Sequence, residues 1–138
     1  MKAKELLYGI YVYFNCFDGS KIIAKVTGFN DGIVYGVSEH GTHWCQISKI
    51  EPIPLIPEIL EKNGFVENRG VTSWKFETDR EDLIDIYGVK DYHLSINIED
   101  THGSGKSYRW MLNNLTIFYV HQLQHALRLC GIEKEIIL

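Results

Sequence analysis

The stretch IYVYFNCFDGSKIIAKVTGFNDGIVYGV, residues 10–37, decides the fold of the first part of the chain. Three runs rich in β-branched and aromatic residues, at 10–17, 22–29 and 33–37, are separated by Asp-Gly-Ser and Asn-Asp-Gly, which are strong turn signals. Residues 43–47 repeat the pattern after a third turn. Short strands joined by tight glycine turns predict an antiparallel meander of the kind that forms an SH3-like barrel.

Proline marks the end of this meander. The segment IEPIPL, residues 50–55, carries alternate prolines, which remove backbone donors and hold the chain extended. Pro57 suits the first turn of a short helix, and Gly64 suits its left-handed C-terminal cap. We therefore place one module at 1–50 and a second at 51–138. We expect them to unfold as one cooperative unit, because each alone would be marginal in size.

The second module contains several runs in which apolar and polar residues alternate. The clearest is YHLSINI, residues 92–98, which predicts a half-buried strand. Residues 72–76 and 108–112 follow the same pattern. Asn113-Asn114 predicts a turn, and a further strand is expected at 115–118.

A helix is expected to follow these strands. Residues 120–130 carry an apolar stripe at helical spacing, and residues 133–138 either close as an edge strand or stay loose. The acid-rich segment 77–85 is interpreted as a solvated loop, or equally as a docking face for a basic partner. The predicted fold is α+β: an SH3-like meander or barrel packed on an antiparallel sheet with a short helix and a C-terminal helix.

Composition indicates a globular protein of the cytoplasm. The 138 residues are 45% hydrophobic and include three Trp, eight Tyr and six Phe, which suffices for a core. Three widely spaced cysteines suit reduced thiols better than a disulfide framework. The apolar runs are far shorter than a membrane span, and no leader pattern opens the sequence, so we expect no membrane partner.

The charge distribution argues against a nucleic-acid partner. The net charge is −4, and residues 51–138 are the more acidic part. A generic nucleic-acid binder neutralises phosphates with a clustered basic face, which the sequence does not show. The local exception is Lys21 and Lys25, which share a strand face near many aromatic residues of the kind that stack on bases.

Two motifs resemble known sites without completing them. The string HGSGKS, residues 102–107, resembles the end of a phosphate-binding loop, but Asp100 stands where the first glycine is needed and a strand follows instead of a helix. We interpret it as a polar hairpin loop in which Lys106 makes at most a weak phosphate contact. His121 and His125 have metal-ligand spacing on a helix, but no third ligand is predicted. We expect an exposed or hydrogen-bonded helix surface there, nearly neutral substitution of either histidine by Ala, and neither metal nor cofactor.

Aromatic residues are concentrated in the first module. In residues 10–17, Tyr11 and Tyr13 share one face while the opposite face is also apolar, so one face is either covered by the second module or exposed for binding. Tyr11, Tyr13 and Trp44 are therefore candidate binding residues, together with Lys106 and His121. Cys45 has no adjacent base, and we find no paired carboxylates or triad, so we do not expect an enzyme.

Several islands of the sequence resemble a group of small proteins of Bacteroides-type gut bacteria, their prophages and mobile elements. The islands, spread over both modules, are MKAKEL at 1–6 with Gly9, IEPIPL at 50–55, Gly64-Phe65, and YVHQLQ at 119–124. This chain lacks the Arg and Asn that usually flank the first glycine in the group, and it has His125 where Asn is frequent. The resemblance implies a shared fold and a mobile-element setting, and it implies no reaction.

These observations predict a non-enzymatic accessory protein that acts by protein–protein interaction, with another protein or with a second copy of itself. The alternative is a protein that binds or sequesters a small, nucleotide-like ligand in an aromatic and glycine-rich pocket.

Overall fold

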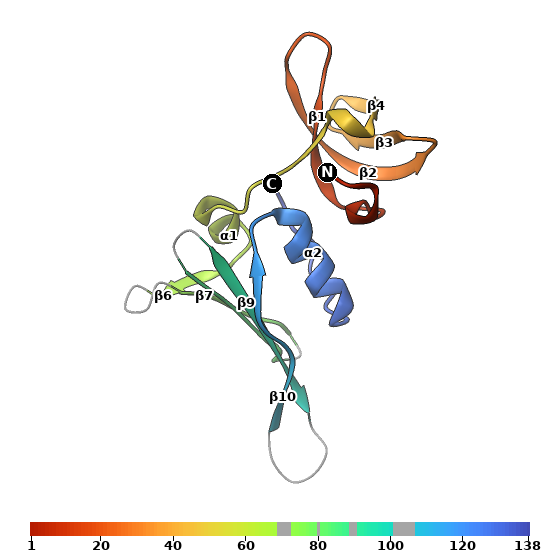
Figure 1. Ribbon diagram of the computed structural model, residues 1–138. Coiled ribbons are helices and arrows are strands. Elements are labelled where there is room, and N and C mark those ends of the chain that lie inside the picture. The colour runs from red at the N-terminus through yellow and green to blue at the C-terminus, as the bar shows by residue number, and fades with distance from the viewer. Residues whose placement is uncertain (69–72, 80, 89–90, 101–106) are drawn as a thin grey trace. The chain divides into compact units, whose positions relative to one another are not determined.

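The chain divides into two compact units, each built on a five-stranded antiparallel sheet (Figure 1). Unit 1 contains Met1–Pro54 and Tyr119–His121, and unit 2 contains Leu55–Phe118 and Gln122–Leu138. The computed structural model describes residues 1–68, 73–79, 81–88, 91–100 and 107–138. Two such sheets accompanied by α-helices confirm the α+β class expected from the sequence.

Unit 1 is a meander whose last strand returns to the first. Its elements are η1 (Ala3–Glu5), β1 (Tyr11–Asn15), β2 (Lys21–Asn30), β3 (Ile33–Ser38), β4 (Gly41–Gln46), η2 (Ile47–Lys49) and β5 (Ile50–Pro52). The strand order is β4-β3-β2-β1-β5, so that β1 lies between β2 and β5. The meander agrees with the sequence pattern, and its SH3-like identity stays a prediction.

The turn between β2 and β3 shows how the sequence specifies a hairpin. Asp31 and Gly32 have φ angles of 50° and 77°. Positive φ at both central residues is typical of a type I′ turn, whose twist matches that of the paired strands. Asn30 pairs directly with Ile33 across this turn. The Asn-Asp-Gly signal therefore forms a two-residue connection that fixes the register of β2 on β3.

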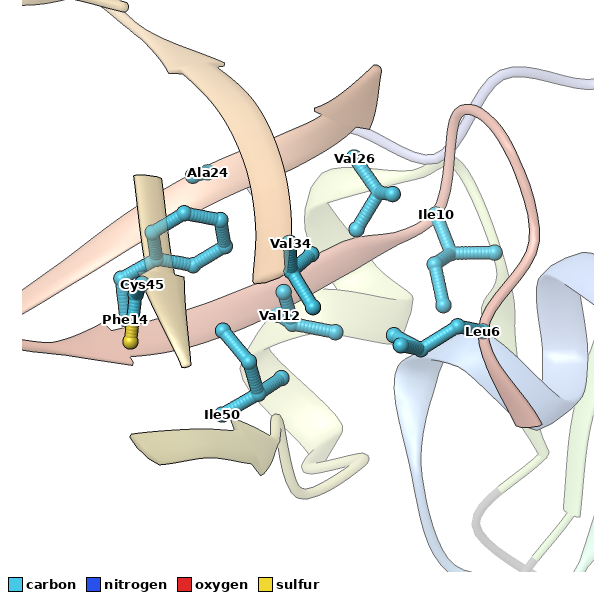
Figure 2. Packing of buried hydrophobic residues seen from close by; sticks show 9 residues of the cluster. All are labelled: Leu6, Ile10, Val12, Phe14, Ala24, Val26, Val34, Cys45 and Ile50. Carbon is cyan, nitrogen blue, oxygen red and sulfur yellow. The ribbon is translucent and has the colours of Figure 1, made fainter. Parts of the chain in front are cut away.

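One face of the unit 1 sheet supplies the core of the unit. Along β1, Val12 and Phe14 are buried, while the intervening Tyr11 and Tyr13 are only half-buried. The core cluster consists of Leu6, Ile10, Val12, Phe14, Ala24, Val26, Val34, Cys45 and Ile50 (Figure 2). Strand alternation thus sends one set of side chains inward and leaves the other set on the second face.

Gly36 of β3 makes room for the largest of these core side chains. A Cβ atom added at Gly36 would lie 2.8 Å from Cζ of Phe14 and 3.1 Å from Cβ of Ala24. A separation below 3 Å is a steric clash, so any larger residue would force the ring of Phe14 to move. The glycine is therefore required by packing rather than by a turn.

Unit 2 is a simple meander in which each strand pairs with the next along the chain. Its elements are α1 (Pro57–Lys62), β6 (Val66–Asn68), β7 (Ser73–Glu77), β8 (Leu83–Tyr87), β9 (Tyr92–Asp100), β10 (Ser107–Ile117) and α2 (Val120–Leu129), of which α2 belongs to this unit from Gln122 onward. The strand order is β10-β9-β8-β7-β6. The predicted helices at 57–62 and 120–130 correspond to α1 and α2.

The apolar face of the unit 2 sheet is built from rows of directly opposed residues. Trp74 pairs with Ile86, and Ile86 pairs with Leu94, so three buried side chains lie in line across β7, β8 and β9. Leu123 and Leu127 of α2 are also fully buried in this unit. These rows form the second hydrophobic core of the chain.

The turn expected at Asn113-Asn114 is wrong, because β10 continues through it. The register shifts between Leu112 and Leu115, and Asn114 has a φ of 60°. The backbone N–H of Asn114 donates to Oγ of Ser95 at 3.1 Å, which keeps the irregular residue tied to β9. The two asparagines therefore form a bulge within one strand rather than a turn between two.

The interpretation of residues 77–85 as a solvated loop is also wrong in part. Leu83–Tyr87 is β8, a strand flanked by β7 and β9. Ile84 and Ile86 are fully buried, and Asp82 just before the strand keeps only 3% of its surface exposed. The many acidic residues of this segment hide the alternation of apolar and polar residues that identifies β8 as a strand.

The last residues of the chain are held by α1 rather than by strand pairing. Asn63, just after α1, donates from Nδ2 to the carbonyl of Ile137 at 2.8 Å and accepts from its N–H at 2.7 Å. Lys62 donates from Nζ to the Leu138 carbonyl at 2.6 Å. Of the two alternatives left open for 133–138, neither an edge strand nor a loose end describes this arrangement.

Candidate functional site

The second face of the unit 1 sheet gathers aromatic and apolar side chains from four strands. Direct partners in an antiparallel sheet point to the same side, so the register defines this face. Tyr13 pairs with Ile23, Tyr11 pairs with Lys25 and Lys25 with Val37, and Tyr35 pairs with Trp44. We call the set the aromatic face: Tyr11, Tyr13, Lys21, Ile23, Lys25, Tyr35, Val37 and Trp44.

Much of the aromatic face is exposed. Trp44 keeps 64% of its surface exposed and Tyr35 keeps 46%, and Ile23 and Val37 are also exposed. Tyr11 and Tyr13 are half-buried. Large apolar side chains that lie exposed side by side on one sheet face are typical of interaction surfaces, whereas single exposed ones need no explanation.

Two lysines lie over rings of this face. Nζ of Lys21 is 5.5 Å from the ring centroid of Tyr13, and Nζ of Lys25 is 5.8 Å from that of Tyr11. Both distances fall within the range of cation–π attraction. Lys21 also forms an ion pair of 2.5 Å with Glu51 of β5, and this hydrogen bond lowers the pKa of the Glu51 carboxyl group. The charge of Lys21 is therefore balanced within the unit.

The structure brings together three of the five residues that sequence reasoning selected. Tyr11, Tyr13 and Trp44 all belong to the aromatic face. Lys106 lies outside the described residues, and with it most of the candidate phosphate loop. His121 lies elsewhere, in the first turn of α2. Tyr35 and Val37 complete the face. The period-two pattern of 33–37 already contained the signal for them.

His121 is buried, which corrects the expectation of a tolerant surface position. The side chain keeps 2% of its surface exposed, and its ring stacks on Tyr119 with centroids 5.7 Å apart. A buried, stacked ring contributes packing that Ala cannot replace, so His121→Ala should cost more than the half kilocalorie typical of surface changes. Within the described part of the chain, no group of three or more His, Cys, Asp or Glu side chains is arranged to hold a metal ion.

The cysteines are free thiols. Cys45 and Cys130 are buried and Cys16 is half-buried. Burial raises the pKa of the Cys45 and Cys130 thiols, which favours the protonated and less nucleophilic form. His43 turns to Ser38, with Nε2 and Oγ 2.7 Å apart. His43 and Cys45 are two residues apart on β4, opposite Gly36 and Val34 of β3, so they share one face of the strand.

A cavity in unit 2 was not foreseen from the sequence. It has a volume of about 560 Å³ and is lined by Phe76, Thr78, Asp79, Asp82, Gly131, Ile132, Glu133 and Lys134. These residues come from the connection between β7 and β8 and from the segment after α2. The two segments are about fifty residues apart in the chain. Local sequence patterns do not reveal contacts at that separation, so the sequence contains no signal for this cavity.

Comparisons with known proteins complete the description of the site. Among the residues that the structure describes, none forms a helix with the length and apolar character needed to span a membrane. The chain matches no family model, no curated protein and no solved structure. The resemblance to small proteins of Bacteroides-type bacteria and their mobile elements therefore stays a prediction.

Proposed function

We propose that this chain is a non-enzymatic accessory protein, of phage or mobile-element type, that acts by binding another protein through the aromatic face of unit 1. The observation that supports the proposal most directly is the exposure of Trp44 and Tyr35 as a cross-strand pair on the side of the sheet opposite the core. Tyr and Trp are the side chains most enriched among residues that dominate binding energy in protein interfaces.

Charge favours a protein over a nucleic acid as the occupant of this face. Lys21 is neutralised by Glu51, and Lys25 lies over the ring of Tyr11. Residues 1–54 contain five lysines and five acidic residues. Non-specific affinity for nucleic acid depends on net neutralisation of phosphates, which a balanced surface does not supply.

A capture experiment with matched variants tests the proposal. The tagged protein is incubated with extract of Bacteroides-type cells, the setting that the resemblance implies, and retained proteins are identified by mass spectrometry. The test variant is Tyr35→Ser, Trp44→Ser. The matched control is Val66→Ser, which removes a similarly exposed apolar side chain from β6 in unit 2.

We expect a partner that wild type and Val66→Ser retain equally and that the double variant loses by tenfold or more. Retention of the same proteins by all three forms would contradict the assignment of the aromatic face. Sedimentation of the purified chain measures its oligomeric state, and a dimer would identify a second copy of the chain as the partner. Sub-micromolar binding of single-stranded DNA at about 150 mM salt, abolished in Lys21→Glu, Lys25→Glu, would replace the protein partner by a nucleic acid.

A further inference from the structure

The cavity of unit 2 combines an apolar wall with charged side chains of both signs. Phe76 and Ile132 provide apolar surface, while Asp79, Asp82, Glu133 and Lys134 provide charge. Its volume of about 560 Å³ lies in the range of small-molecule sites, which are concave, partly apolar and carry a few convergent polar groups. The cavity belongs entirely to unit 2 and shares no residue with the aromatic face.

The ammonium group of Lys134 is held against aromatic rings instead of a carboxylate. Its Nζ is 3.9 Å from the ring centroid of Phe76 and 6.0 Å from that of Phe65. The two rings are themselves 5.4 Å apart and tilted by 43°. Lys134 forms no ion pair with the described residues, although three carboxylates line the same cavity. Burial lowers the pKa of its amine, as expected for a cation that lacks a charged partner.

Asp79 and Glu133 are more exposed than Lys134, and they too have no charged partner among the described residues. Both line the cavity, and within the described ranges of the chain neither forms an ion pair or a side-chain hydrogen bond. Asp82 adds a third carboxylate that is almost completely buried, and its charge is felt by the nearby Cys130 thiol, whose pKa it helps to raise. Asp79, Glu133 and Lys134 therefore line one cavity without forming ion pairs with each other.

We propose that this cavity binds a zwitterionic amino acid with an apolar side chain. The ligand carboxylate pairs with the ammonium of Lys134, the ligand ammonium pairs with Asp79 and Glu133, and its side chain lies along Phe76 and Ile132. A simple anion is repelled by the three carboxylates, and a simple cation by Lys134. A ligand that carries both charges pairs with the carboxylates and with Lys134 at the same time.

Three ligands that differ only in charge test this assignment. L-phenylalanine carries both groups, 2-phenylethylamine keeps the ammonium alone, and 3-phenylpropionate keeps the carboxylate alone. Binding of each to the full chain is measured by isothermal titration calorimetry at low ionic strength, where charge effects are least screened. We expect phenylalanine to bind at least tenfold more tightly than either analogue.

Two variants should separately remove recognition of the ligand carboxylate and recognition of the ligand ammonium. Lys134→Met keeps the apolar stem and loses the charge, so phenylalanine and 2-phenylethylamine should then bind within about twofold of each other. Asp79→Asn, Glu133→Gln should equalise phenylalanine and 3-phenylpropionate. Lys75→Met is the matched control, because Lys75 lies outside the cavity with its Nζ 3.8 Å from Asp85. It should preserve the wild-type order.

The outcomes separate the proposal from its alternatives. Equal binding of the three ligands to wild type, preference for a single-charge analogue, or no heat of binding at millimolar phenylalanine would each overturn it. Loss of selectivity in the Lys75→Met control would do the same. Melting temperatures of the variants, measured alongside, show that each is folded when it is titrated. None of these results bears on the protein-binding proposal for unit 1.

Discussion

Unit 1 and unit 2 each bury one face of a five-stranded antiparallel meander, and they differ in what the second face carries. In unit 1 the second face is aromatic, with Trp44 and Tyr35 exposed as neighbours. In unit 2 the corresponding face is mainly polar and, among its described side chains, carries a single exposed ring, Trp110, opposite Asn97. There Lys75 pairs with Asp85, and Asp85 with Ser95, across three strands.

Some polar side chains on this face of unit 2 contact one another. The hydroxyl of Tyr87 donates to Oδ1 of Asn114 at 2.9 Å, and its ring stacks on His93 with centroids 5.5 Å apart. Nζ of Lys75 lies 3.8 Å from Oδ1 of Asp85. Ser73 and Ser95 of the same face are buried, so only part of this face is exposed to solvent.

The difference indicates which of the two second faces is suited to binding a partner. Exposed polar residues such as Lys75 are solvated, and a single exposed ring such as Trp110 needs no ligand to explain it. Trp44 and Tyr35, exposed side by side, leave a continuous apolar area in contact with water, and a bound partner would remove it. Substitutions on both sheets therefore test this contrast.

Phe14→Ala should have the largest effect on stability. The ring lies in the core of unit 1 and fills the space that the missing side chain of Gly36 leaves. Removal of a buried phenyl group costs about 3–5 kcal/mol. Urea unfolding followed by far-UV circular dichroism measures the change. Substitution of an exposed aromatic residue, Phe17→Ala, is the control and should stay within about 0.5 kcal/mol of wild type.

The same variant tests whether the two units unfold together. If they do, amide exchange should quicken in β9 of unit 2 as much as in β2 of unit 1, because one global opening governs both. Faster exchange confined to β1–β5 would show that the units are independent, and it would refute the cooperative unfolding predicted from the sequence.

Most of the strand content could be predicted because alternation is a local signal. The meander of unit 1 follows from apolar runs and Gly turns, and both α-helices follow from spacing and end signals. β8 was missed because acidic residues surround Ile84 and Ile86. The bulge at Asn114 was read as a turn because its partner, Ser95, is distant in sequence.

The candidate sites were predictable to different degrees. Tyr11 and Tyr13 share a face by strand period alone, so the aromatic face was partly visible in the sequence. That Trp44 joins them depends on the register of three strand pairs. The cavity beside Lys134 was invisible, because its approach to Phe76 depends on tertiary packing between residues far apart in sequence.

Gly36→Ala should have the next largest effect. The added methyl group would clash with Phe14 and approach Ala24, and overpacking of a core costs about 1–3 kcal/mol. Gly28→Ala in β2 is the matched control, since a methyl group added there would meet no atom within 4 Å. Thermal unfolding should separate the two; equal melting temperatures would contradict the packing role given to Gly36.

Ser95→Ala probes the polar face of unit 2. Oγ of this buried serine accepts the backbone N–H of Asn114, so its loss leaves a donor of the bulge without that partner. We expect a loss of about 1 kcal/mol and faster exchange of the Asn114 amide. Thr116→Val removes a more exposed contact to His93 and should have little effect. A neutral Ser95→Ala would mean that the polar face is not stabilised by its own contacts.

Trp44→Thr should have the smallest effect on stability and thereby sharpens the contrast. Trp44 is exposed on β4, and Thr keeps a high preference for strands, so the free energy of unfolding should change by less than about 0.5 kcal/mol. The same substitution should abolish retention of the protein partner. Ser95→Ala should behave in the opposite way, with lower stability and intact binding. If Trp44→Thr instead destabilises the chain by more than about 1 kcal/mol, the ring is a structural element of the fold, and the aromatic face loses the property that distinguishes it from the second face of unit 2.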